Sequence, residues 1–80
     1  MMTKMGATQT LNIKGVNCPM PVMWARTQLD SLEIGETLEI LATDPSAISN
    51  FQAFTRTTGH ELVEHSEDGG VIRLLIRKTA

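Results

Sequence analysis

The chain has 80 residues, enough for one domain with its own core but too few to enclose a deep substrate cavity. A net charge of −2 with 20% charged residues argues against a free-standing nucleic-acid binder, and a hydrophobic fraction of 41% argues against disorder. No signal peptide or membrane-spanning segment is evident, so we expect a cytoplasmic protein. Residues 1–8 are expected to form a mobile N-terminal tail and residues 9–80 a single domain.

The first predicted elements are a strand and an amphipathic helix. Residues 10–14 alternate polar and apolar side chains, which predicts a strand with Leu11 and Ile13 on its buried face. In the next segment, apolar residues recur at the spacing of one helix face, at Val22, Ala25, Leu29 and Leu32. Trp24 lies off this stripe and is expected to pack at the periphery or to be partly exposed.

A second strand and a second helix follow. Residues 36–42 predict a strand that pairs in parallel with the first, because a crossover helix separates the two. Asp44 and Pro45 are typical of a helix start, with Asp44 as the capping acceptor and Pro45 at the first helical position. The expected buried side of this helix holds Ala47, Ile48, Phe51 and Phe54 or Thr55, and Gly59 is expected to end it.

The last part of the chain predicts a β-hairpin with two possible registers. One register pairs Ser66 with Val71, and the other, with its turn centred on Gly69 and Gly70, pairs Glu67 with Ile72. We favour the first, because it sets side chains of opposite charge across from each other. The predicted order is therefore β-α-β-α-β-β. This order predicts an α+β fold, a two-layer sandwich with both helices on one face of a four-stranded mixed sheet.

Cys18 is the only cysteine in the chain, so it has no partner for an internal disulfide and no companions for a multi-thiolate zinc site. It lies between the first strand and the first helix, and Pro19 and Pro21 suit the first turn of a helix. A helix N-terminus stabilises a thiolate, so we expect the pKa of Cys18 to be moderately lowered. A small buried hydrophobic side chain is the alternative for such a cysteine.

Five segments resemble the TusA/SirA-like family of sulfur-carrier proteins. Residues 15–22 hold a Cys-Pro-x-Pro motif that follows a glycine, and the other four segments are residues 35–38, 43–45, 59–62 and 75–78. The resemblance extends from Leu11 to Lys78, almost the whole chain. It implies a sulfurtransferase-like carrier that accepts sulfane sulfur as a persulfide on Cys18 and hands it to a partner protein, acting stoichiometrically.

The resemblance also implies the surroundings of this thiol. Gly15, Pro19 and Pro21 would position the loop, and no metal or organic cofactor is expected. The implied partners are a donor of the rhodanese or cysteine desulfurase type and an acceptor sulfurtransferase, with no membrane and no direct nucleic-acid binding. The carrier itself would be a monomer or a weak oligomer. Its pathway would be tRNA thiolation, dissimilatory sulfur oxidation, cofactor biosynthesis or selenium metabolism.

Three residues are candidate contacts of a donor or partner: Met20, Arg26 and Asp44. Met20 stands between the two prolines, where the tRNA-thiolation branch has glutamate, and it would make the rim of the thiol more apolar and suit a different docking partner. Arg26 would attract an anionic donor or simply be solvated, and Asp44 would reach the same edge or act only as a cap.

Two other classes of function remain open at this point. A redox-sensing thiol would need glutathione, a partner or a second copy, since the chain has no resolving cysteine. A regulatory interaction module would not use the thiol at all. Metal binding by His60 and His65 is disfavoured, because their spacing places them on opposite faces of a strand. The cations near the C-terminus are expected to pair with glutamates across the hairpin: Arg73, Arg77 and Lys78 with Glu61 and Glu64.

Overall fold

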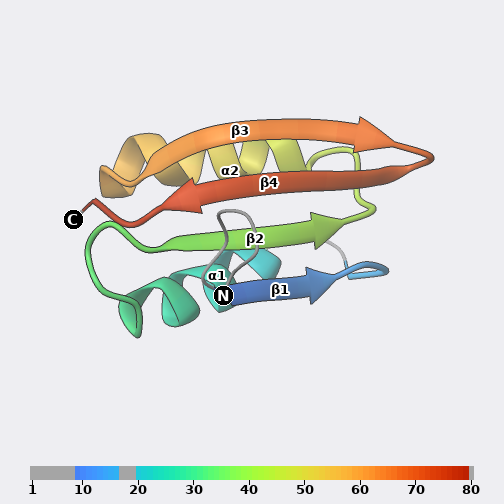
Figure 1. Ribbon diagram of the computed structural model, residues 1–80. Coiled ribbons are helices and arrows are strands. Elements are labelled where there is room, and N and C mark those ends of the chain that lie inside the picture. Colours follow the sequence, from blue (N-terminus) through green and yellow to red (C-terminus); the bar gives the residue numbers. More distant parts are fainter. Residues whose placement is uncertain (1–8, 17–19, 80) are drawn as a thin grey trace.

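The computed structural model describes residues 9–16 and 20–79, with only the backbone of Met20 and Pro21. Its elements in chain order are β1 (Gln9–Ile13), α1 (Met20–Asp30), β2 (Thr37–Ala42), α2 (Ala47–Thr58), β3 (Glu61–Asp68) and β4 (Val71–Arg77). The four strands form one sheet in the order β1-β2-β4-β3, and both helices lie behind it in Figure 1. The predicted α+β sandwich is thus confirmed.

The sheet is mixed because its two halves are connected differently. β1 pairs with β2 in parallel, from Gln9 opposite Leu38 to Ile13 opposite Ala42, as the intervening helix predicts. β4 lies antiparallel to both β2 and β3. The carboxyl ends of β1 and β2 therefore meet at one edge of the sheet, where both helices begin.

Alternating apolar residues of the sheet and stripes of both helices form the core. The sheet contributes Leu38, Ile40 and Ala42 from β2 and Ile72, Leu74 and Ile76 from β4, all buried. The helices contribute Ala25, Leu29, Phe51 and Phe54. Phe51 is fully buried, and its ring meets that of Phe54 edge-on at a centroid distance of 6.1 Å. Within the described part of the chain, no helix is both long and apolar enough to cross a membrane.

The helix boundaries differ from the predicted ones by a few residues. α2 begins at Ala47, so Pro45 is not its first helical residue. The N-cap is Ser46 and not Asp44. The Asp44 Oδ1 instead accepts the N–H of Ser46 at 3.0 Å and the Ser46 hydroxyl at 2.9 Å. These bonds close a turn that precedes the helix. At the other end, Gly59 has a φ of 86° and donates its N–H to the carbonyl of Thr55, which confirms the predicted stop.

The favoured register of the hairpin is wrong, and the alternative is correct. Glu67 pairs with Ile72, and Gly69 and Gly70 form the turn with φ angles of 61° and 84°. A tight turn with two positive φ angles requires residues such as glycine at both central positions, and this requirement outweighs the charge match. A bulge between Leu62 and Glu64 shifts the pairing, and on the far side of this bulge Glu61 lies opposite Arg77. One pair of opposite charges is therefore still matched across the hairpin.

The predicted charge pairing across the hairpin is present, and it extends to β2. Arg73 contacts Glu64 with an Nη1–Oε2 distance of 3.3 Å and also forms an ion pair with Glu39. Arg77 Nη1 lies 2.8 Å from Glu61 Oε1. Lys78 differs from the prediction, since its Nζ donates to the carbonyls of Asp30 and Leu32 at the end of α1.

Candidate functional site

Cys18 and Pro19 lie outside the residues that the structure describes, and the site is built from what stands on either side of them. β1 ends at Ile13 and α1 begins at Met20, so the chain reaches Cys18 from the carboxyl end of a strand and leaves it at the amino end of a helix. In α/β units this edge gathers loops and helix N-termini, which is why functional groups concentrate there.

The turn after β1 is held in place by hydrogen bonds on both sides. The N–H of Val16 donates to the carbonyl of Ile13 at 3.1 Å, and Gly15, the third residue of this turn, has a φ of 83°. The N–H of Gly15 donates to Thr43 Oγ1 at 2.8 Å. Because a side chain at this φ would be strained, the predicted positioning role of Gly15 has a physical basis. The turn is thus tied to the residue that directly follows β2.

Thr43 is the residue that the sequence reasoning missed. Its hydroxyl accepts the N–H of Gly15 across two parallel strands and so fixes the spacing between their carboxyl ends. A polar residue directly after the second of two parallel strands was the available signal, since such residues face the loop that leaves the first strand.

Of the predicted contact residues, Asp44 and Met20 lie at this edge and Arg26 does not. Asp44 follows Thr43, and its carboxylate accepts two hydrogen bonds from Ser46 in the turn before α2, so it does not cap the helix as expected. Met20 is the first residue of α1, and its side chain is not described. Arg26 lies six residues further on, about 9 Å along the helix axis.

The exposed apolar residues of α1 lie in the half of the helix that is closer to Cys18 in sequence. Met23 is 63% exposed and Trp24 is 43% exposed, whereas Ala25 is completely buried. Trp24 is thus partly exposed, as its place off the helical stripe predicts. Large exposed apolar side chains that stand together suggest a surface for another protein.

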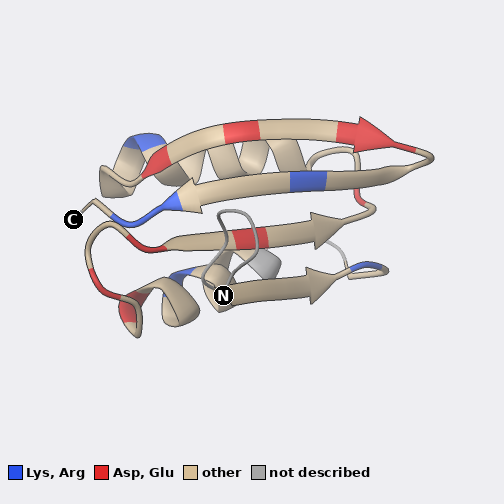
Figure 2. Cartoon of the chain, viewed as in Figure 1, with Lys and Arg blue, Asp and Glu red and all other residues tan. Residues whose placement is uncertain are grey.

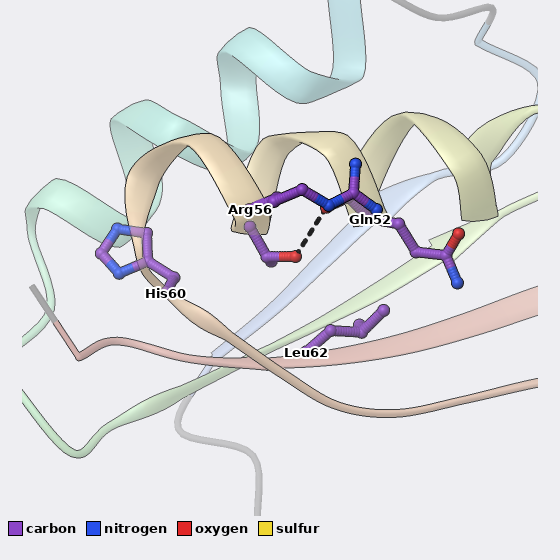
Figure 3. Close-up of a pocket in the computed structure, with 5 residues that line it drawn as sticks. Gln52, Arg56, His60 and Leu62 are labelled. Atoms are coloured by element: carbon purple, nitrogen blue, oxygen red, sulfur yellow. Dashed lines mark hydrogen bonds between the residues drawn. The ribbon is translucent and has the colours of Figure 1, made fainter.

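A separate group of polar residues surrounds His60, at the opposite end of α2. A shallow hollow of about 340 Å³ between α2 and β3 is lined by Gln52, Thr55, Arg56, His60 and Leu62 (Figure 3). A second hollow beside His60 is lined by Arg26, Asp30, Thr57 and Thr58. The structure therefore groups Arg26 with the carboxyl ends of the two helices rather than with the turn at Gly15.

His60 has neighbours that favour its neutral form. Burial and, to a smaller extent, the charge of Lys78 lower the pKa of His60, and Asp30 opposes them. Its Nδ1 accepts the N–H of Thr79 at 3.3 Å, and its ring lies 6.1 Å from that of Phe54. His65 lies further along, within the exposed strand β3. Across residues 9–16 and 20–79, no group of three or more potential ligands could hold a metal ion.

The fold and the site together define a class of protein, a small two-layer domain with one cysteine between its first strand and its first helix. Comparison with known proteins specifies this class further. Residues 9–78 match the family model described as Sulfurtransferase TusA. The chain is 41% identical over 71 residues to the sulfur carrier protein TusA of Allochromatium vinosum, covering 89% of this chain and 93% of that protein.

Two further relatives agree with this match. A putative sulfur carrier protein of Neisseria meningitidis serogroup A is 40% identical over 70 residues, covering 88% of this chain and 95% of that protein. The crystal structure of a SirA-like protein from Desulfitobacterium hafniense superposes with a TM-score of 0.80 at 28% identity, covering 91% of this chain and all of that one. The chain belongs to the TusA family of sulfur carriers, and the predicted resemblance is confirmed.

Proposed function

We propose that the protein carries sulfur as a persulfide on Cys18, accepting it from a donor protein and passing it to an acceptor. The observation that carries this proposal is the position of the only cysteine, two residues before the amino end of α1 in a chain of the TusA family. A sulfur relay needs a nucleophilic thiol that two different proteins can reach in turn.

The chemistry requires no cofactor. The thiolate of Cys18 attacks the outer sulfur of a donor persulfide, the donor's sulfur–sulfur bond breaks, and the donor leaves as a thiolate. Handover repeats this exchange with an acceptor thiolate, and the transferred sulfur keeps its oxidation state throughout. Each step therefore balances without an added oxidant or reductant.

Helix α1 supplies the electrostatic support for the thiolate. It has 11 residues, and its amino end carries a partial positive charge of about half a unit, which favours an anionic sulfur. Gly15, Pro19 and Pro21 act in this proposal as positioning residues. The hydrogen bond between Gly15 and Thr43 supports the part assigned to Gly15.

The surface beside the site suits protein partners. Met23 and Trp24 are exposed on α1, in the half of the helix that is closer to Cys18 in sequence. We assign donor or partner contacts to Met20, Arg26 and Asp44, with Arg26 reached only by a partner that extends along α1. The partners we propose are a rhodanese or cysteine desulfurase as donor and a sulfurtransferase as acceptor.

Membership of the family supports a proposal for the setting and the pathway. We propose a cytoplasmic carrier, a monomer or weak oligomer with one domain over residues 9–80. It serves tRNA thiolation, dissimilatory sulfur oxidation, cofactor biosynthesis or selenium metabolism. Met20 between the prolines favours a partner with an apolar docking surface.

Mass spectrometry of the intact protein and its peptides tests this proposal. The protein is exposed to thiosulfate with a rhodanese, and separately to cysteine with a cysteine desulfurase, with Cys18→Ser as the control. We expect a single added sulfur on the peptide that contains Cys18, removable by reductant and absent from the control. A protein that takes up no sulfur but forms sulfenic acid when a parallel sample is given hydrogen peroxide would support a redox sensor. A free thiol that is never modified would support an interaction module.

A further inference from the structure

The two outer strands of the sheet differ in how readily a further strand could pair with them. β3 carries four exposed acidic residues, Glu61, Glu64, Glu67 and Asp68, and a bulge interrupts its pairing. Charges and bulges on an edge strand oppose the addition of another strand. β1 has neither feature, since Gln9–Ile13 contains no charged residue and its register with β2 is continuous. Figure 2 shows this contrast as red segments on β3 and none on β1.

Among the described strands, none but β2 pairs with β1, so its outer side has no described partner. The strand order places β1 at the border of the sheet, and Figure 1 shows it as the last arrow of the sheet, beside β2. Every second residue of an edge strand directs its N–H and C=O groups outward, where they can pair with another extended chain. An added strand would lie about 4.8 Å from β1.

Lys14 places a positive charge at the carboxyl end of β1, which favours a partner with negative charge. It is exposed in the turn that directly follows β1, and the three ion pairs of the described residues all use Arg73 or Arg77. A carboxylate on an added strand would therefore meet a cation at the carboxyl end of β1. Lysine at this position favours an acidic partner segment over a neutral or basic one.

A second copy of the same chain does not fit this preference. β3 of a second copy is acidic, but its bulge opposes the addition of a strand. β1 itself has no acidic residue, and the Glu39 carboxylate beside it on β2 already accepts the Thr10 hydroxyl and pairs with Arg73. Pairing through two β1 strands would leave both lysines without a counter-charge. The occupant that matches the border is a segment of a different protein.

We propose that the open border of β1 binds an extended acidic segment of the relay partner by strand addition, with a carboxylate beside Lys14. The proposal rests on the proposed function in one respect, that the partner is a sulfur donor or acceptor. The end of β1 is tied through Gly15 to Thr43, so a strand added there is aligned with the carboxyl edges of both parallel strands. Such pairing would orient a partner beside the turn that leads from β1 to Cys18.

A titration followed by NMR tests the binding without any sulfur chemistry. The isotope-labelled Cys18→Ser protein is titrated with a ten-residue peptide of alternating threonine and valine that carries two glutamates, and with a matched peptide that carries two lysines. We expect amide shifts confined to β1 and Lys14. We also expect the acidic peptide to bind about two- to fivefold more tightly, a difference that Lys14→Gln removes.

Three results of this titration would overturn the proposal. They are the absence of shifts in β1 at millimolar peptide, equal affinity for the two peptides, and shifts on β3 or the helices instead of β1. Arg56→Gln is the matched control, because it removes an exposed cation from α2 and should leave the preference for the acidic peptide intact.

A loading assay then separates this proposal from the proposed function. The Lys14→Gln variant should take sulfur from inorganic polysulfide at the wild-type rate but about two- to fivefold more slowly from a persulfidated rhodanese. Equal slowing with both donors would contradict a docking role for Lys14. If the wild-type protein takes no sulfur from either donor, the sulfur carrier proposal fails, whereas strand addition is judged by the titration alone.

Discussion

β1 and the β3–β4 hairpin stand at the two borders of one sheet, but they are held in different ways. The hairpin joins strands of 8 and 7 residues through a two-glycine turn, and all three ion pairs of the described residues involve its arginines. β1 has 5 residues, and only Ile13 among them is fully buried. The segment that carries Cys18 directly follows this short strand.

This difference separates the region that stabilises the fold from the region to which we assign the sulfur chemistry. Most of the buried apolar residues lie in α2 and the two central strands, whereas β1 contributes only Ile13, and no other described strand pairs with its outer side. Regions with few buried apolar contacts open at lower free energy than the core, and binding segments are drawn from them. The predictions that follow test whether the two regions respond separately to substitution.

The largest effect is expected in the core beside the hairpin. Phe51 is completely buried, and Phe51→Ala should lower the free energy of unfolding by about 3–5 kcal/mol, since it removes apolar contact and leaves a cavity. Urea denaturation followed by circular dichroism measures this loss. Gln52→Ala, at the exposed neighbouring position, is the control and should change stability little. A loss below about 1 kcal/mol for Phe51→Ala would contradict the assignment of the core.

Removal of the bond between the two parallel strand ends should have a smaller effect on stability. Thr43→Val deletes the acceptor of the Gly15 N–H and should cost about 0.5–1.5 kcal/mol. If the turn positions the thiol, the rate of sulfur loading on Cys18 also falls. Thr10→Val is the matched control, because its hydroxyl bonds to Glu39 on the sheet and not to the turn. Equal loading rates for both variants would show that the turn does not position the thiol.

The ion pairs should contribute less to the free energy of unfolding, and those of Arg73 should contribute more than that of Arg77. Arg73→Met removes the contacts to Glu39 and Glu64 and should cost about 1 kcal/mol or less, an effect that weakens in high salt. Arg77→Met should cost less, since both Arg77 and Glu61 are more than 40% exposed, whereas Glu39 is 21% exposed. Thermal unfolding at low and high salt compares the two. A larger loss for Arg77→Met would reverse the expected order.

The smallest effect is a dependence of stability on pH through His60. Burial lowers the pKa of His60 below its ordinary value of 6.5, so the folded protein binds this proton less readily than the unfolded chain. The stabilisation is present above pH 6.5 and is lost as the pH falls through the lowered pKa. Protonation would also end the acceptor role of Nδ1 toward Thr79.

Urea denaturation at about pH 7.5 and about pH 5.5 measures this dependence. His60→Gln should reduce the loss of stability between the two conditions. His65→Gln removes a histidine from exposed β3 and is the matched control. An unchanged pH dependence in His60→Gln would contradict the role of burial at this residue.

Much of the fold follows from patterns that act over short distances. The alternation of Leu11 and Ile13 and the helical spacing of Ala25 and Leu29 identify buried faces, and one crossover helix determines the parallel pairing. Gly59 ends its helix because glycine adopts a positive φ readily. These features depend on residues that are neighbours in the sequence or on a rule of chain connection.

The wrong predictions arise where the structure is determined by contacts between distant residues or by interactions that compete with each other. In the hairpin, the backbone angles of Gly69 and Gly70 outweigh the charge pairing of single residues. At α2, the side chain of Asp44 closes a turn before the helix begins. Thr43 bonds to Gly15 across 28 positions of sequence, and its place after the second strand indicates which loop it faces but not the atom to which it bonds. The position of Arg26 beside the end of α2 likewise depends on how the two helices pack.

A two-step transfer of labelled sulfur tests the central claim most directly. The protein is loaded with isotopically labelled sulfane sulfur, freed of donor and mixed with an acceptor sulfurtransferase, and both proteins are followed by intact mass spectrometry. The account predicts that one labelled sulfur leaves the peptide containing Cys18 and appears on the acceptor, and that Cys18→Ser transfers none. Labelled sulfur that stays on Cys18, or that reaches the acceptor equally well with Cys18→Ser, would contradict it.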